Sequence, residues 1–590
     1  MSAIVGFIVM KDVEHTSQQK AGAAIQKALT HFPNLKQITL NVGDTQLLAW
    51  GHDTLTDSIH HMPDGSVLAL IGPQAGVRSW ATVQAQLLRD PLPQNFILPW
   101  EGRAFLVKIN PDGRQWTMWN DWLGSIPVYH APVKDGWIAS TLEPAVVDGA
   151  GFTPDDIFLP GLISLLIHGH TIGEWSLYKS MKVVPPDSVV VWNGRGFDAK
   201  PYFTVQPTKD RWQTSWDDLI DEMHELTLRA VGDVLKTNER WILPLSSGLD
   251  SRIIAAVGAE IGANMHAYTW GARYSEDFEY APQIAHKLGI PWKWIDIGTD
   301  YLAKYIQLWA DLFGSATHFH GMYQMPFLDA IRSEGPARII SGFFGDTLAG
   351  YDVHFQTEYH SPSVRPYQAC TDDYLHWTVQ DVRSLLKLDA TDAFEELASE
   401  IEKQRTLMPG AWFQRIRYLT FWGRQRHFTY FQTKLSDYWR GVDTPYLQKD
   451  YARFCLSLPR AVLDDRRLQE DMIRRYYGKV AVIPGSFAPE PLIFTGRYLV
   501  KKKITKILPA PLRKGPFRDF SATILSRDAE CVRDTGDRAI WPLRETWKQL
   551  GEWVNLDMLE REYRSAVNGD VRSVRKLQSV QTLAYRLMDA

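Results

Sequence analysis

Cysteine is scarce in this sequence, with only Cys370, Cys455 and Cys531 among 590 residues. Their spacing fits neither a metal site nor a disulfide framework, so a reducing compartment is expected. No run of about 20 apolar residues occurs, which argues against a membrane-spanning helix. The N-terminus also lacks the basic and apolar segments of a signal peptide, and we therefore expect a cytoplasmic protein.

Charge of one sign is also lacking, because the formal net charge is only −4. This net charge argues neither for nor against a nucleic-acid partner, and we predict none. Hydrophobic residues make up 45% and charged residues 22% of the chain, as in soluble globular proteins. A chain of 590 residues exceeds what one hydrophobic core holds, so two or more domains are expected.

Short β-like runs separated by turns dominate residues 1–203. The runs cover 3–10, 46–50, 67–71, 104–109, 116–119, 136–139 and 188–192. Asp64-Gly65 and Asp112-Gly113 are dipeptides typical of hairpin turns. This pattern predicts an antiparallel β-sandwich with a few helices. The polar, proline-containing segment 204–215 is expected to be a linker.

The segment 240–252 carries the clearest sign of chemistry. An apolar strand over 241–245 runs into Ser246-Ser247-Gly248, and a helix begins near Asp250. A glycine beside small hydroxyl residues permits a tight turn whose N–H groups, with the helix N-terminus, would bind an anion. Asp250 would then hold the accompanying Mg²⁺. No Gly-Lys-Ser/Thr follows, so this is not a Walker loop, and an ordinary strand-to-helix turn is the alternative.

Apolar strands alternate with helical patterns around this turn, which indicates parallel βαβ units and an α/β fold. The expected strands are 265–270, 292–297 and 337–342, and the expected helices are 216–235, 278–288, 302–312 and 325–333. Right-handed crossovers bring the turns 246–251, 271–277 and 342–347 to one edge of the sheet. Asp346 would join Asp250 there, and two carboxylates suit Mg²⁺ bound to phosphate oxygens.

Two of these turns resemble motifs of the asparagine synthetase family. Leu-Ser-Ser-Gly-Leu-Asp-Ser at 245–251 resembles its pyrophosphate loop, usually written Ser-Gly-Gly-Leu-Asp-Ser-Ser, from which Ser247 and Arg252 depart. The segment 340–351 resembles its Ser-Gly-x-Gly-x-Asp-Glu-x-x-Gly-Gly-Tyr segment, with Phe344 in place of the second glycine. The resemblance implies an ATP-pyrophosphatase (PP-loop) synthetase domain at 216–490, using ATP and Mg²⁺, and a basic, helical extension at 491–590. It assigns nucleotide binding to Ser246, Ser247, Gly248, Leu249, Asp250, Ser251, Thr269, Trp270, Gly271, Gly342 and Phe343, and metal binding to Asp250 and Asp346.

The N-terminal residues resemble the family's Ntn-type glutamine amidotransferase domain over 2–7, 120–129 and 184–188. In that family a cysteine follows the initiator Met, and its thiolate attacks glutamine. Ser2 stands at that position here, and no Asn-Gly-Glu triplet occurs near 70–74. We therefore predict a degenerate glutaminase-like domain that releases no ammonia.

Other departures concern the synthetase part. Phe343 replaces a carboxylate or tyrosine of the family, Thr347 replaces a glutamate, and Gln448 replaces an aspartate. No lysine lies in register near 483–486, where the family has a catalytic one; Lys479 and Lys501–Lys503 are the nearest. If the reaction uses a base, His318 and His320 are candidates by type, and a purely structural histidine is the alternative.

These observations predict an AMP-forming ligase that adenylates a peptide or small-molecule carboxylate and lets an amine displace AMP. Within the family, the resemblance points to the branch of lasso-peptide macrolactam cyclases and β-lactam synthetases, with a possible protease or precursor-peptide partner. Two alternatives stay open: ammonia-dependent amidation of a surface-glycan sugar acid, and a degenerate nucleotide-binding scaffold. The basic stretch 496–518 would bind an acidic peptide or anionic membrane surface, or is a solvated face.

Overall fold

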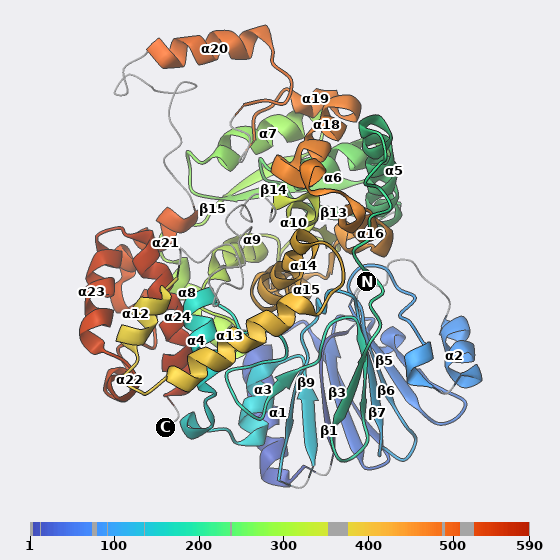
Figure 1. Cartoon of the computed structure of the whole chain (residues 1–590), viewed down its shortest axis with the longest axis vertical. Helices are drawn as coiled ribbons and strands as arrows, with labels where there is room; N and C mark the ends of the chain where they lie inside the picture. The colour runs from blue at the N-terminus through green and yellow to red at the C-terminus, as the bar shows by residue number, and fades with distance from the viewer. Residues whose placement is uncertain are drawn as a thin grey trace.

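The computed structural model describes residues 4–11, 13–72, 80–90, 92–134, 136–236, 239–351, 376–485, 490–507 and 524–588. Two units stack along the long axis of the molecule (Figure 1). The N-terminal unit (described residues up to 203) is built on an antiparallel sheet, and the C-terminal unit (described residues from 216) on a parallel one. Ser2 lies outside the described residues.

The N-terminal unit is a sandwich whose two layers meet at β1 (Ile4–Lys11). This strand pairs antiparallel with β3 (Thr45–Gly51) and with β9 (Trp137–Ser140), and Ile4 also pairs with Ile71 of β5 (Val67–Ile71). One continuous core lies between the layers, with Phe7, Phe105 and Trp116 among its buried side chains. The other described strands are β2 (Lys36–Val42), β4 (Ile59–His61), β6 (Phe105–Ile109), β7 (Trp116–Asn120), β8 (Tyr129–Pro132), β10 (Lys182–Val183), β11 (Ser188–Trp192) and β12 (Phe197–Pro201). The expected β-sandwich is confirmed.

Helices cover both outer faces of this sandwich. On one face lie α1 (His15–Leu29) and α3 (Glu143–Ala150). Ala21, Ala24, Ile25 and Ala28 make one buried stripe along α1, because their spacing follows the helical period. On the other face, α2 (Trp80–Arg89) contributes Val83 and Leu87 to a smaller core. The fold is therefore layered helix–sheet–sheet–helix.

The C-terminal unit contains a five-stranded parallel sheet in the order β15-β14-β13-β16-β17. Its strands are β13 (Trp241–Pro244), β14 (Met265–Gly271), β15 (Trp292–Asp296), β16 (Arg338–Ile340) and β17 (Val442–Asp443). The helices α5 (Trp216–Leu235), α6 (Leu249–Glu260) and α7 (Glu276–Leu288) share one core, while α8 (Tyr301–Phe313) and α9 (Met325–Ala330) belong to another. The α/β fold is confirmed.

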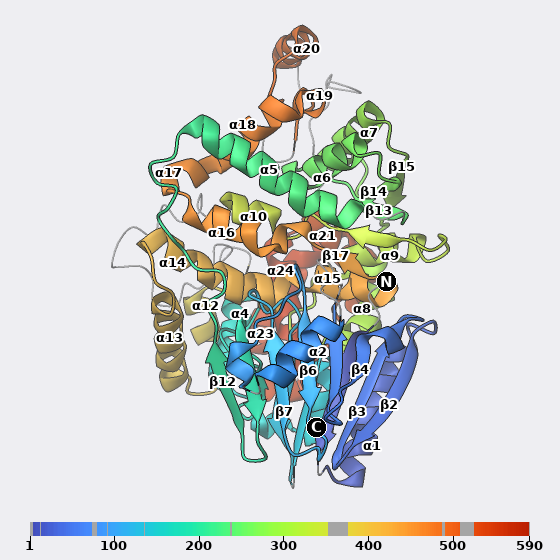
Figure 2. The ribbon, with the colours of Figure 1, turned by 90° about the vertical axis from the view of Figure 1, so that its right-hand side faces the viewer.

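The rest of the C-terminal unit is mostly helical. It contains α10 (Gly345–Ala349), α12 (Val379–Leu385), α13 (Thr391–Thr406), α14 (Trp412–Tyr418), the π-helix η7 (Leu419–Thr429), α15 (Phe431–Trp439), α16 (Lys449–Ser457), α17 (Arg460–Leu463), α18 (Arg467–Tyr476) and α19 (Gly478–Ala481). After these come α20 (Gly496–Ile507), α21 (Ile524–Thr535), α22 (Trp547–Trp553), α23 (Leu556–Val567) and α24 (Val571–Arg586). The helix α20 stands away from the body in two perpendicular views (Figures 1 and 2). Part of the basic stretch, residues 508–518, lies outside the described residues. Across the described chain, we find no helix with the length and apolar character that a bilayer crossing needs.

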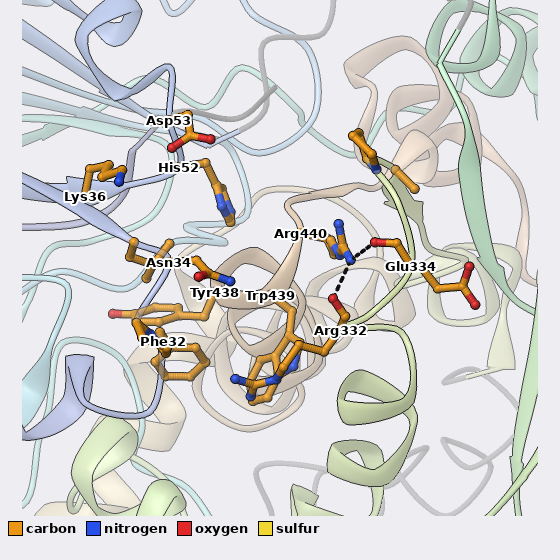
Figure 3. Close-up of a pocket in the computed structure, with 14 residues that line it drawn as sticks. Phe32, Asn34, Lys36, His52, Asp53, Arg332, Glu334, Tyr438, Trp439 and Arg440 are labelled. Carbon is orange, nitrogen blue, oxygen red and sulfur yellow. Dashed lines mark hydrogen bonds between the residues drawn. The ribbon is translucent and has the colours of Figure 1, made fainter.

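The two units meet along α15, and buried polar contacts fix the interface. The indole of Trp50 donates to the Tyr438 hydroxyl at 3.0 Å, and that of Trp122 donates to the Leu447 carbonyl at 2.9 Å. Arg103 pairs with Asp437 at 2.7 Å, and both side chains are buried. A cavity of about 520 Å³ opens beside these contacts (Figure 3). The Arg440 guanidinium in its wall is already occupied, because it donates to backbone carbonyls of the segment 331–335.

Candidate active site

The turn between β13 and α6 satisfies its own hydrogen bonds. The Ser246 amide donates to the Ser251 hydroxyl and the Gly248 amide to the Ser246 hydroxyl, both at 3.1 Å. The two hydroxyl oxygens lie 3.0 Å apart. The side chains of Ser246 and Ser251 line a cavity at the sheet edge. This loop therefore offers hydroxyl groups to a ligand, while these two amides are used internally.

Asp277 binds the middle of the same loop. Its Oδ1 accepts from the amide of Ser247 at 2.7 Å and from the hydroxyl of Ser247 at 2.6 Å. Asp277 lies in the first turn of α7, whose N-cap Ser275 accepts from the Phe278 amide. A carboxylate oxygen thus takes the kind of position on Ser247 that a phosphate oxygen would take.

The turn after β16 packs directly against Asp250. A Cβ at Gly345 would lie 2.8 Å from the Asp250 carboxyl carbon, and one at Gly342 would lie 3.2 Å from the Asp250 Cβ. Between them Phe344 has φ of +75°, which explains why a glycine was expected there. Phe344 fits because its ring packs on Trp122 and Phe421.

Two carboxylates meet at this point, as the sequence predicted. Asp250 and Asp346 both line the cavity. Burial raises the pKa of Asp250, Arg466 opposes this effect and the nearby Asp346 adds to it, so the pKa is above its ordinary value. Asp346 accepts from the amide and hydroxyl of Thr347. Two part-buried, mutually repelling carboxylates favour a bound cation, so these residues fit Mg²⁺.

The protein does not build a complete metal cage here. Among the described residues, no group of three or more His, Cys, Asp or Glu side chains is arranged to hold a metal ion. Mg²⁺ is commonly held by one or two carboxylates, with phosphate oxygens and water completing its shell. Asp250 and Asp346 would therefore hold it together with a polyphosphate.

The cavity has a volume of about 360 Å³ and gathers most of the predicted residues. It is lined by Ser246, Asp250, Ser251, Thr269, Trp270, Gly342, Phe343 and Asp346 from the predicted set, and by Asp277, Phe344, Arg424, Gln425, Thr429 and Gln432 outside it. Ser247, Gly248, Leu249 and Gly271 do not line it. Ser247 is fully buried, so its contribution is to hold Asp277. The nucleotide-binding role of all these residues stays a prediction.

The β14 end of the cavity is rigid and partly aromatic. The Thr269 hydroxyl donates to the Leu245 carbonyl at 2.6 Å and accepts from the Trp292 indole at 2.8 Å. Trp270 stacks on Phe327 with ring centroids 4.3 Å apart. A flat apolar wall of this kind suits a nucleobase.

The π-helix η7 forms one wall of the cavity, and its π-helical form was not predicted. Arg424, Gln425 and Thr429 line the cavity from this helix. Gln425 donates to the Thr347 hydroxyl at 2.9 Å, which ties the helix to the residue after Asp346. π-Helical turns are rare and occur often at functional sites.

The two candidate bases, His318 and His320, lie outside the lining of this cavity. Their rings pack against Phe428 of η7, with centroids 4.5 Å and 5.5 Å away. Burial lowers the pKa of His318 well below its ordinary value. His318 is therefore neutral, and its catalytic role stays a prediction without support from the cavity geometry.

No lysine from the described part of the chain lines the cavity. Lys479 lies in α19, and Lys501–Lys503 lie in the outlying α20. The cation that contacts Asp250 is Arg466, whose Nη2 lies 2.8 Å from Oδ1. Sequence reasoning missed Arg466 because no motif marks its approach to the site.

Arg252, the residue that departs from the family's last serine, braces the Ser246–Gly248 turn from behind. Its guanidinium is buried and donates to the carbonyls of Ser247, Val480, Ile483 and Pro484 at 2.7–3.2 Å. It thereby joins the loop to the segment after α19.

A sequence comparison agrees with this geometry. A family model for asparagine synthase matches residues 222–587, more than half of the chain. The chain belongs to the asparagine synthase family. It is thus a member of an ATP-dependent family of amidotransferases and C–N ligases.

Other comparisons add little to this assignment. No curated protein matches the chain. Among solved structures, an allosteric regulatory enzyme of purine biosynthesis is 9% identical, with 52% of this chain and 78% of that chain covered, at a TM-score of 0.23. The B. subtilis glutamine phosphoribosylpyrophosphate amidotransferase complexed with ADP and GMP is 10% identical, with 67% and 89% covered, at a TM-score of 0.22. Both similarities are too weak to bear on function.

Proposed function

We propose that this member of the asparagine synthase family is an AMP-forming amide ligase. A substrate carboxylate attacks the α-phosphate of ATP, pyrophosphate leaves, and an amine then displaces AMP to form the amide. The single observation that carries the proposal is the meeting of Asp250 and Asp346 in one cavity at the carboxyl edge of the parallel sheet. Mg²⁺, when bound there, supplies charge neutralisation at the phosphate oxygens.

The chain's own residues then have separate tasks. Asp250 and Asp346 hold the cation, and the hydroxyls of Ser246 and Ser251 orient the phosphates. Thr269 and Trp270 bound the nucleobase end, since both line the cavity at β14. Most of the rate advantage would come from positioning and charge stabilisation, because such a reaction needs little covalent chemistry from the protein.

The cavity suits a peptide or another apolar molecule as substrate better than it suits aspartate and ammonia. Phe343 and Phe344 line the cavity where the family has a polar group and a glycine. A phenyl ring neither accepts a proton nor pairs with an amine cation as a carboxylate does. We therefore favour macrolactam formation within one peptide, with a precursor-peptide or protease partner, over ammonia-dependent amidation of a surface-glycan acid.

Pyrophosphate release from Mg-ATP, measured with a panel of peptide and small-molecule carboxylates, tests the proposal. Asp250→Asn is expected to abolish release, because it removes a cation ligand without changing side-chain size. Asp233→Asn is the matched control, since Asp233 is exposed and pairs only locally with Lys236 among the described residues. Equal release from Asp250→Asn and the wild type would disprove the metal assignment.

One observation favours a second candidate, a nucleotide-binding scaffold without turnover. In this structure the Ser246–Gly248 amides and the Asp250 carboxylate already have partners within the protein. The same assay separates the two functions: a scaffold would bind Mg-ATP yet release no pyrophosphate with any carboxylate. Intact-mass analysis of a turned-over substrate, showing the loss of one water, would establish the ligase.

A further inference from the structure

Arg466 reaches the site through an unusual backbone turn. Between α17 and α18, Asp465 and Arg466 have φ values of +57° and +58°. Two successive non-glycine residues in the left-handed region are uncommon, and such conformations persist where surrounding contacts hold them. The turn places the Arg466 side chain in the protein interior, with 6% of its surface exposed.

The side chains of Arg466, Asp250 and Gln469 each contact the other two. Arg466 Nη2 lies 2.8 Å from Asp250 Oδ1, and Gln469 Nε2 donates to the same oxygen at 2.8 Å. Arg466 Nε and Nη2 donate to Gln469 Oε1 at 2.9 Å and 2.5 Å. Both hydrogen bonds recorded to the carboxylate among the described residues thus go to Oδ1, and Oδ2 is the oxygen that remains for a cation.

Arg466 is also within electrostatic range of the second carboxylate. Burial alone would lower its pKa, but the charges of Asp250 and Asp346 outweigh burial and raise it. The guanidinium is therefore charged at neutral pH. One buried cation balances two carboxylates at the phosphate end of the cavity.

We infer that Arg466 is a resident cation at the phosphate end of the site, which positions Asp250 and makes metal and polyphosphate bind together. This inference rests on the proposed function. A divalent ion alone would be repelled by the guanidinium nearby, and would share Asp250 with it. A polyphosphate alone would face the carboxylates of Asp250 and Asp346. When both bind, Arg466 places a positive charge beside the metal ion. The catalytic lysine of the family would supply such a charge in a site that contains it.

The test is Mn²⁺ binding to the full chain by electron paramagnetic resonance, with and without inorganic pyrophosphate. Arg466→Gln is expected to bind Mn²⁺ alone roughly tenfold more tightly than the wild type, because a neighbouring like charge is removed. It should bind Mn²⁺ with pyrophosphate roughly tenfold more weakly, because the positive charge that Arg466 holds beside the two carboxylates is lost. Arg467→Gln is the matched control: this neighbouring side chain is exposed and lies over the Trp216 ring. Its two affinities should equal those of the wild type.

The inference would be overturned if folded Arg466→Gln binds Mn²⁺ alone no more tightly than the wild type does. Loss of an arginine with a purely structural role would lower the Mn²⁺ affinity or leave it unchanged. If Arg466→Gln does not fold, Arg466→Lys takes its place. Retaining the charge, it should keep both affinities within about threefold of the wild type, and loss of the pyrophosphate effect would overturn the inference. If the wild type binds neither Mn²⁺ with ATP nor Mn²⁺ with pyrophosphate, the proposed function itself fails.

Discussion

Replacing Arg252 by serine restores the residue that the family motif carries and should nevertheless destabilise the active site. Four backbone carbonyls accept hydrogen bonds from this guanidinium. The nitrogen-to-oxygen distances are 2.8 Å for Ser247 and Pro484, 2.7 Å for Ile483 and 3.2 Å for Val480. Burial lowers the pKa of Arg252 to about 10, so the group is still charged at neutral pH. It links the Ser246–Gly248 turn to residues 480–484.

The cost follows from what the substitution leaves behind. Hydrogen bonds to a charged group contribute about 1.5–3 kcal/mol each, while burying the guanidinium itself costs several kcal/mol. Removing one partner of a buried charged network usually costs about 3–5 kcal/mol. Serine is too short to reach the carbonyls of Val480, Ile483 and Pro484, so they would lose their donor. We expect a local loss of about 3 kcal/mol, which corresponds to about a hundredfold change in an opening equilibrium.

Hydrogen exchange read by mass spectrometry is the suitable assay, because a chain of this size need not unfold in one step. Peptides covering 245–251 and 478–485 should lose about a hundredfold in protection in Arg252→Ser. Arg252→Lys should recover part of it, since an ammonium has three donors for the four carbonyls. Arg229→Ser is the control, because Arg229 is 57% exposed and its pair with Asp450 is a surface one. Unchanged protection of both peptides in Arg252→Ser would refute the bracing role.

Two further expectations concern stability. Burial lowers the pKa of Lys434 from its ordinary 10.5 to about 7. Between about pH 7 and 10.5 the unfolded state therefore binds one more proton than the folded state. The free energy of unfolding of the wild type should rise with pH across that window. The thermal midpoint of Lys434→Met should vary less with pH. Gly6→Ala should destabilise the N-terminal sheet by about 1–3 kcal/mol, since its Cβ would lie 2.4 Å from the Trp50 ring. Gly22→Ala on α1, where the space around a Cβ is open, should stabilise by about 0.5–1 kcal/mol, and urea unfolding of the two variants checks both signs.

The sequence predicted those elements whose formation depends on local pattern. The helix predicted over 216–235 is α5, whose buried Leu219, Met223 and Val231 repeat at helical spacing behind the N-cap Ser215. The strand predicted over 265–270 is β14, a fully paired central strand. The carboxylates Asp250 and Asp346 were brought together correctly, because parallel topology alone fixes the edge at which both turns lie.

The parts that could not be predicted depend on contacts distant in sequence. The strand β17 is two residues long and is recognisable only by its pairing with β16. The π-helix η7 is buried nearly all round, so no apolar stripe marks it. Arg466 enters the site through two left-handed residues that are not glycine, a conformation that no local propensity predicts. In each case tertiary packing outweighs the local pattern.

The N-terminal unit has a role at the site that does not require glutaminase chemistry. It supports η7, which contributes Arg424, Gln425 and Thr429 to the cavity that Asp250 and Asp346 line. Arg426 of η7 donates to the carbonyls of Gly173 and Val184, and the Trp422 indole donates to the Trp122 carbonyl at 3.0 Å. A Cβ at Gly124 would lie 2.7 Å from the Arg426 side chain, so the two units pack closely along this helix.

From the same helix, Gln425 donates to the Thr347 hydroxyl, next to Asp346, the proposed metal ligand. The helix therefore connects the N-terminal unit to the cavity that Asp250 and Asp346 line. This arrangement gives a physical reason for keeping the N-terminal unit even if Ser2 and the missing Asn-Gly-Glu triplet have ended ammonia release. Without that unit, η7 would lose the acceptors of its buried arginine and tryptophan, and the cavity would lose one wall.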